Sequence, residues 1–178
     1  MRGREVPTVS VVGNGYVGTV VAACLASLGR RVIGLEADPV KLRTLRSGRA
    51  PFHEPGLDEL LDHGIEHGAL RFTADPREAA ESADVIFLCV GSPPREDGSA
   101  DLRALEEAAR SLAPWLMPAQ VMVVKTTVPV GTAEWLGEVM AQASSSGGGR
   151  VPAVVSNPEF LRQGSAVQDF LHPDRIVL

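Results

Sequence analysis

The stretch VSVVGNGYVG, residues 9–18, decides the fold. Its apolar first half predicts a buried strand over residues 9–12, and the residues from Tyr16 predict a helix that ends at Leu28, before a glycine. A strand, a Gly-x-Gly-x-x-Gly turn and a helix in this order are typical of a dinucleotide-binding unit, whereas an ordinary turn is the alternative interpretation of the glycines alone.

Each glycine of this turn has a different expected role. Gly13 permits the tight turn, Gly15 lets the backbone approach a pyrophosphate, and Gly18 lets the helix pack closely on the strand. The start of the helix then offers unpaired N–H groups and a positive partial charge to phosphates. We therefore expect the whole turn to bind the cofactor, that is, Gly13, Asn14, Gly15, Tyr16, Val17 and Gly18.

An acidic residue ends the second predicted strand, residues 31–36. Glu36 follows the last glycine at close to the roughly 20-residue spacing at which a carboxylate binds the ribose hydroxyls. A carboxylate there would repel a 2′-phosphate, so we expect NAD rather than NADP. Lys41 and Arg43 are close enough in sequence to meet a phosphate, so NADP is the alternative cofactor, and Lys41 is a further candidate for binding the cofactor. A solvated strand end is the alternative interpretation of Glu36.

Short apolar runs alternate with helical patterns along the rest of the chain. This alternation predicts a doubly wound parallel α/β sheet, a Rossmann-type domain spanning residues 1–178, with a surface loop at 144–149. The continuous apolar run within residues 84–90 predicts a strand that is buried on both faces. The expected helices span 39–46, 57–67, 76–82, 101–116 and 132–143, and the expected strands span 70–73, 84–90, 121–125 and 151–156, with another beginning at 176.

Composition excludes several classes of partner. A formal net charge of −5 at pH 7 disfavours binding to nucleic acid. No window approaches the roughly 18 apolar residues that span a membrane. Cys24 and Cys89 lie apart in apolar runs, which predicts buried thiols, no disulfide framework and a cytoplasmic location. His63 and His67 have helical i, i+4 spacing but no evident third ligand, so we expect no metal site.

Five segments resemble, in order, motifs of the UDP-glucose/GDP-mannose dehydrogenase family: GNGYVG at 13–18, FHEPGL at 52–57, CVGSPP at 89–94, KTTVPVGT at 125–132 and SNPEFLRQGSAVQDFLHPDRIV at 156–177. The resemblance covers essentially the whole chain. It implies an NAD-dependent enzyme that oxidises the C6 alcohol of a nucleotide sugar to a carboxylate. The HPDRIV segment favours a UDP-glucose-like substrate.

The resemblance also implies roles for individual residues. Thr127 would position the hydrolytic water, and Glu159 would act as an acid or base and contact substrate. From local pattern alone, Thr127 could be a plain β-residue and Glu159 the start of a helix. Further residues implied to bind the cofactor are Val90, Gly91, Ser92, Pro93, Thr126 and Gln163. Residues implied to bind the sugar nucleotide, largely through their backbone, are Phe160, Leu161, Arg162 and Gln163.

Three substitutions depart from the family pattern: Glu36 replaces an aspartate, Thr126 a serine and Gln163 a glutamate that faces the cofactor. Family members also continue into a second domain that supplies a nucleophilic cysteine, a lysine and an asparagine, and we expect that half to be absent here. We therefore expect a homo-oligomer or a partner chain that supplies it. A non-catalytic NAD-binding module is the alternative. A hydroxyacid dehydrogenase fits the glycines but not NPEFLRQG.

Overall fold

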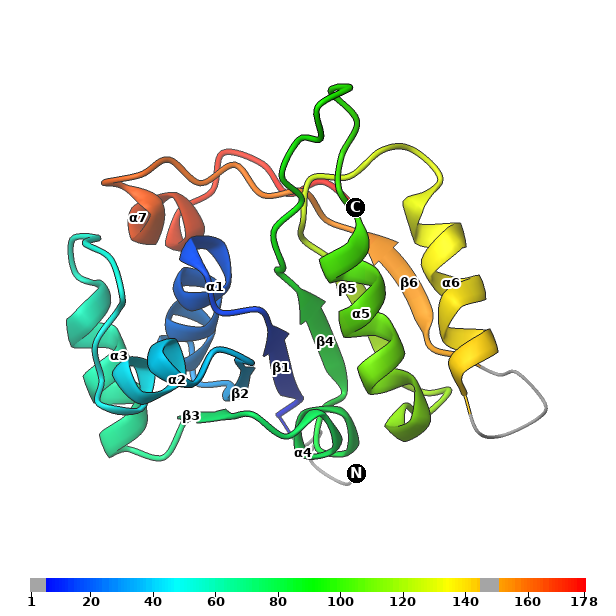
Figure 1. Cartoon of the computed structure of the whole chain (residues 1–178). Coiled ribbons are helices and arrows are strands. Elements are labelled where there is room, and N and C mark those ends of the chain that lie inside the picture. The colour runs from blue at the N-terminus through cyan, green and yellow to red at the C-terminus, as the bar shows by residue number, and fades with distance from the viewer. Residues whose placement is uncertain (1–5, 145–150) are drawn as a thin grey trace.

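The computed structural model describes residues 6–144 and 151–178 of the chain. Within these residues, six parallel strands form one sheet with the order β3-β2-β1-β4-β5-β6 (Figure 1). The strand order reverses between β1 and β4, where doubly wound sheets bind ligands at the carboxyl ends of their strands. The strands are β1 (Thr8–Val12), β2 (Arg31–Leu35), β3 (Leu70–Thr73), β4 (Val85–Leu88), β5 (Val121–Val124) and β6 (Ala153–Ser156).

Helices connect successive strands. Five of them, α1, α2, α3, α4 and α6, begin where the sequence predicts. At the starts of α2 and α4, Asp38 and Asp75 accept hydrogen bonds from N–H groups of the first turn, and a proline follows each. The helices are α1 (Tyr16–Ser27), α2 (Pro39–Arg46), α3 (Leu57–Glu66), α4 (Pro76–Glu81), α5 (Arg103–Leu112), the 3₁₀ turn η1 (Ala113–Trp115), α6 (Thr132–Ala143) and α7 (Ala166–Leu171).

Alternate side chains of the strands enter two separate cores. Val11 packs in a cluster with α1, α2, α3 and α7, whereas the adjacent Val12 packs in a cluster with α4, α5 and α6. Successive side chains of a strand point to opposite faces, so the sheet is covered by helices on both. The doubly wound α/β fold expected from the sequence is therefore confirmed.

Several elements are shorter than the sequence predicts, and the largest differences concern the strand predicted over 84–90 and the helix predicted over 101–116, which ends at Leu112. The strand expected over 84–90 ends at Leu88, and Val85 and Phe87 are only partly buried, so this strand is not enclosed on both faces. Phe87 borders a cavity beneath the C-terminal segment, which explains its exposure. The helix expected from Asp101 begins at Arg103, whose N–H donates to the Asp101 carboxylate at 3.1 Å.

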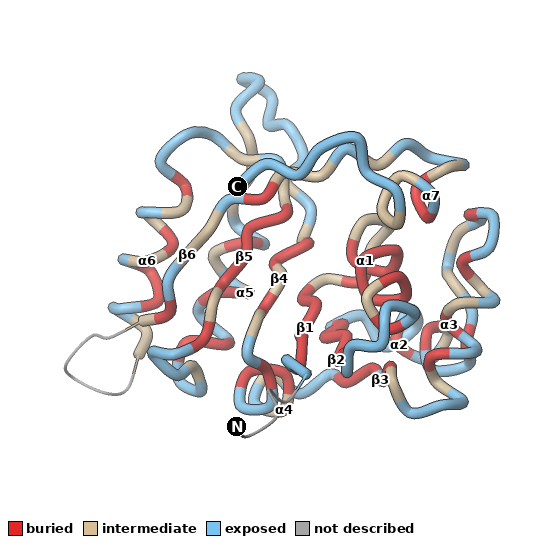
Figure 2. The backbone as a smooth tube through the Cα atoms, turned by 180° about the vertical axis from the view of Figure 1, so that it is seen from behind, coloured by how far each residue is buried: buried red, intermediate tan, exposed pale blue. Residues whose placement is uncertain are grey.

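The C-terminal segment differs most from expectation. No strand begins at Ile176, because the Val177 carbonyl accepts a 2.7 Å hydrogen bond from the Asn157 side chain instead of pairing with a neighbouring strand. Ile176 and Leu178 are 71% and 83% exposed, and Figure 2 shows this exposed run crossing above the sheet. The short helix α7 is absent from the sequence-based prediction. The loop predicted at 144–149 lies, after Ser144, outside the described residues.

Across residues 6–144 and 151–178, none of the helices combines the length and the apolar character needed to span a membrane.

Candidate functional site

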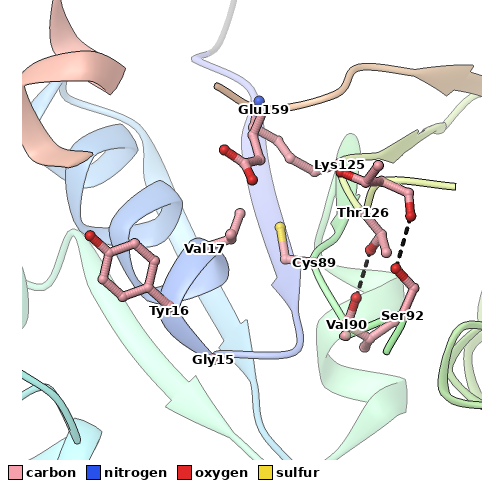
Figure 3. A pocket seen from close by; sticks show the side chains of 11 residues that line it. Gly15, Tyr16, Val17, Cys89, Val90, Ser92, Lys125, Thr126 and Glu159 are labelled. Carbon is pink, nitrogen blue, oxygen red and sulfur yellow. Dashed lines mark hydrogen bonds between the residues drawn. The ribbon is translucent and has the colours of Figure 1, made fainter. Parts of the chain in front are cut away.

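Segments that follow four parallel strands line one cavity of about 250 Å³ at the carboxyl edge of the sheet (Figure 3). The glycine turn after β1 bounds it on one side, and Glu159, after β6, bounds it on the other. Because these segments are far apart in sequence, only the parallel sheet brings them together. The lining residues are Gly15, Tyr16, Val17, Cys89, Val90, Gly91, Ser92, Lys125, Thr126, Thr127 and Glu159.

The three glycines meet three different steric demands. Gly13 has a φ of +83°, and a Cβ built on it would lie 2.7 Å from Val90 Cγ1. A Cβ on Gly18 would lie 2.0 Å from the Gly13 carbonyl oxygen, which shows how closely α1 approaches the turn. A Cβ on Gly15, in contrast, would meet no atom within 4 Å. The backbone of Gly15 therefore faces open space, as a pyrophosphate site requires.

The first turn of α1 is available to an anion. Its N-cap residue, Gly15, provides no side-chain acceptor for the N–H groups that follow. Such N–H groups, with the helix dipole, attract phosphate. The turn, the open space above Gly15 and the helix start thus fit the pyrophosphate of a dinucleotide.

Glu36 is buried rather than a solvated strand end, with 7% of its surface exposed. One carboxylate oxygen accepts a 3.0 Å hydrogen bond from the Asn14 N–H, and the other accepts a 2.9 Å bond from the Asp38 N–H. Glu36 therefore fixes the glycine turn to the end of β2. Asn14 is fully buried and its side chain donates to the Leu35 carbonyl, so it shapes the turn and does not line the cavity.

Two threonines and a serine join the segments after β4 and β5. The Thr126 hydroxyl donates to the Val90 carbonyl at 2.7 Å, and the Ser92 hydroxyl donates to the Thr127 carbonyl at 2.8 Å (Figure 3). These bonds bring Thr127, the expected water-positioning residue, to the same cavity as Glu159. The sequence-based grouping of these residues is matched by their arrangement in space.

Lys125 is a feature of the site that the sequence-based prediction missed. Its side chain is buried between the cavity and Asn157, and its Nζ donates to Asn157 Oδ1 at 3.1 Å. Burial lowers the pKa of the Lys125 ammonium, and the nearby Cys89 and Glu159 oppose this effect. A lysine directly after the buried strand β5 was the available signal, since lysine is seldom buried without a function or a partner.

A second cavity of about 580 Å³ adjoins the first, and Lys125 and Glu159 line both. Phe160, Leu161 and Arg162, three of the residues expected to bind the sugar nucleotide, line this second cavity. Arg162 forms a 2.6 Å ion pair with Asp169 of α7. The segment 159–162 is therefore held against α7 at the edge of a space large enough for part of a ligand.

Seven of the expected cofactor residues line neither cavity, and four of these, Gly13, Asn14, Gly18 and Glu36, form or hold the glycine turn. The other three are exposed. Lys41 is exposed on α2, Pro93 is exposed in the loop after β4, and Gln163 is exposed before Gly164. Gln163 is followed by Gly164, whose φ of +86° suits a glycine.

The cysteines are buried, as the sequence predicts, but Cys89 follows strand β4 rather than lying within it and lines the first cavity. Burial raises the pKa of both thiols to about 12. Neither is a ready nucleophile, because the thiolate is the reactive form. Among the described residues, no group of three or more His, Cys, Asp or Glu side chains is placed to hold a metal ion.

Comparison with known proteins assigns the chain to a family. Residues 7–178 match the sequence model of the UDP-glucose/GDP-mannose dehydrogenase family, NAD binding domain. A UDP-glucose 6-dehydrogenase of Pseudomonas aeruginosa is 44% identical over 169 residues, which are 94% of this chain and 37% of that protein. The chain therefore spans less than half the length of this relative.

Two solved structures of such dehydrogenases superpose closely on this chain. A UDP-glucose dehydrogenase from the archaeon Pyrobaculum islandicum superposes with a TM-score of 0.91 at 44% identity, covering 99% of this chain and 41% of that one. A GDP-mannose dehydrogenase from Pseudomonas aeruginosa gives a TM-score of 0.88 at 34% identity, covering 94% and 39%. The chain belongs to the UDP-glucose/GDP-mannose dehydrogenase family and matches its NAD-binding domain.

Proposed function

We propose that this chain is the NAD-binding half of a nucleotide-sugar 6-dehydrogenase that oxidises the C6 alcohol of a UDP-glucose-like substrate to a uronic acid. The observation that carries the proposal is the single cavity that holds the glycine turn, Thr127 and Glu159 together. When bound, NAD supplies the hydride acceptor for this oxidation. The identity of the relatives supports the substrate class.

The chain's own residues would perform two tasks. The open backbone at Gly15 and the start of α1 would hold the pyrophosphate, while the Thr127 hydroxyl and the Glu159 carboxylate would hold and polarise a water molecule. Lys125 would place a positive charge beside Glu159 in a partly desolvated site, where charges act strongly on developing negative charge. The neighbouring cavity at 160–162 would receive the sugar side of the substrate.

The test is calorimetric titration of the polypeptide 1–178 with NAD, followed by an assay for NADH in the presence of UDP-glucose. The full oxidation of an alcohol to an acid transfers two hydrides and so yields two NADH per sugar. We expect NAD to bind but fewer than two NADH to form per sugar, because the second hydride transfer needs a covalent nucleophile, and Cys24 and Cys89 are buried with a raised pKa. Two equivalents of NADH per sugar from this polypeptide alone would contradict the proposal, as would a failure to bind NAD.

The substrate class has its own test. We expect UDP-glucose to shift the backbone amide resonances of residues 159–163 more than GDP-mannose does at equal concentration. Amide shifts confined to other segments, or a larger response to GDP-mannose, would contradict a UDP-glucose-like substrate while leaving the NAD-binding role intact.

A further inference from the structure

Glu54 is a buried carboxylate that contacts two distant parts of the site. It lies in the loop between α2 and α3, within the FHEPGL segment, and is only 5% exposed. One carboxylate oxygen accepts hydrogen bonds from the Tyr16 hydroxyl and from the Gly164 N–H, the latter at 2.7 Å. The other oxygen accepts a 2.8 Å bond from the Ala166 N–H. A single side chain thus joins the glycine turn to the segment that carries Glu159.

These contacts supply hydrogen-bond acceptors that the residues next to the start of α7 do not provide. Its N-cap residue, Ser165, makes no side-chain capping bond, so Glu54 provides the acceptors for N–H groups at the start of α7. Phe52, in the same loop, packs against the Tyr16 ring with 4.9 Å between the ring centroids. The loop therefore contacts the first turn of α1 and the start of α7 simultaneously.

Within the described residues no ion pair compensates the charge of Glu54, so hydrogen-bond donors stabilise it instead. Burial opposes ionisation, but the hydrogen bonds from Tyr16, Gly164 and Ala166 outweigh it and lower the pKa of Glu54 below its usual range. Loss of the carboxylate would leave the buried Ala166 N–H without an acceptor, which is costly.

We propose that Glu54 is a positioning residue that fastens the segment 159–166 to the NAD-binding turn, so that NAD binding and the placement of Glu159 are coupled through it. Tyr16 lines the cavity on one side and Glu159 on the other, and the Glu54 carboxylate binds both the Tyr16 hydroxyl and the N–H of Gly164, five residues after Glu159. The coupling rests on the proposed function of the cavity, whereas the fastening of the two segments does not.

The experiment compares Glu54→Gln with Asp58→Asn. Asp58 lies close by, and its carboxylate accepts a 2.8 Å bond from the Ala50 N–H without touching either side of the cavity. Amide hydrogen exchange at Gly164 and Ala166 is measured with and without NAD. We expect Glu54→Gln to accelerate exchange at both amides about ten- to a hundredfold and to weaken NAD binding about tenfold or more, because a hydrogen bond to a charged group is lost. Asp58→Asn should do neither.

A spectroscopic readout distinguishes this contact from a general loss of stability. Tyr16 is the only tyrosine in the sequence, so the absorbance of tyrosinate reports on it alone. Burial and the hydrogen bond to Glu54 raise the pKa of Tyr16 to about 12. We expect Glu54→Gln to move this titration toward the ordinary value of 10.0, and Asp58→Asn to leave it unchanged. Tyr16→Phe, which keeps the two backbone donors, should weaken NAD binding less than Glu54→Gln.

The outcomes distinguish two parts of the proposal. The first is that Glu54 holds the segment 159–166 against the NAD-binding turn, and the second is that this contact affects NAD binding. Unchanged exchange at Gly164 and Ala166 in Glu54→Gln would overturn the proposal. Faster exchange with unchanged NAD affinity would show a purely structural contact and overturn the coupling. If the unmodified chain did not bind NAD, the proposed function would fail and the coupling with it, and the exchange data without NAD would still report on the fastening.

Discussion

Replacing Gly18 by alanine should damage the fold, and through it the cofactor site. The new Cβ would lie 2.0 Å from the Gly13 carbonyl oxygen and 3.1 Å from Cys89 Cβ. Real Cβ contacts are essentially never shorter than 3.0 Å, so α1 and the turn must separate by at least about 1 Å. Overpacking of this kind costs about 1–3 kcal/mol or more, and the better helix propensity of alanine offsets up to about 1 kcal/mol.

Replacing Gly15 by alanine should weaken NAD binding and leave the stability of the fold almost unchanged. Its φ of −73° suits any residue, and a Cβ there meets nothing within 4 Å, so stability should change by less than about 0.5 kcal/mol. The methyl group would occupy the space through which a pyrophosphate approaches the backbone. We expect NAD to bind at least about tenfold more weakly, equivalent to about 1.4 kcal/mol.

The assay is thermal unfolding followed by circular dichroism, together with calorimetric titration of NAD. A loss of about 2 kcal/mol should lower the Tm of Gly18→Ala by roughly 4–8 °C. Gly137→Ala, in α6 and away from the cavity, is the matched control, because its Cβ also meets nothing within 4 Å; it should be slightly stabilised and bind NAD normally. Equal destabilisation of the Gly15 and Gly18 variants, or normal NAD binding by Gly15→Ala, would refute the reasoning.

Three further substitutions test single contacts. Glu36→Ala should narrow an initial preference for NAD over NADP of about ten- to a hundredfold, measured by calorimetry, and equal affinities in the unmodified chain would contradict the role of this carboxylate. Lys125→Met should leave Asn157 Oδ1 without its donor and lower stability by about 1–3 kcal/mol in chemical denaturation, and an unchanged midpoint would show that the bond contributes nothing. Gln163→Glu and Gln142→Glu, at an exposed position of α6, should each change the free energy of NAD binding by less than about 0.5 kcal/mol. A larger effect of Gln163→Glu would show that residue 163 moves to meet the cofactor.

Most of the fold could be predicted from sequence because its signals are local. Apolar runs mark the strands, and the structure confirms the starts of the helices predicted from residues 39 and 76. The segment after β6 could not be predicted in this way. The helix α7 has only six residues and receives its N-terminal acceptors from Glu54, more than a hundred positions earlier in the chain. No local periodicity carries that information.

The candidate site, too, could be predicted from sequence only in part. Motif resemblance predicted Thr127 and Glu159, and the parallel sheet places both at one cavity. Lys125 was missed because its importance comes from burial and from its bond to Asn157, which only the folded chain displays. Gln163 was expected to meet the cofactor by its position in the motif. In the folded chain it is exposed and lines neither cavity, which its place in the motif does not reveal.

The bonds that shape this site run from side chains to backbone groups of neighbouring segments. Glu36 holds the glycine turn, Thr126 and Ser92 join the segments after β4 and β5, and Glu54 holds the start of α7. None of these bonds lies within the strand ladders, so removing one leaves the hydrogen bonding of the sheet intact. The cost instead falls on the relative placement of the segments, where a shift of about 1 Å is enough to disturb binding or catalysis. Substitutions at these four positions should therefore reduce ligand affinity more than they reduce the content of secondary structure.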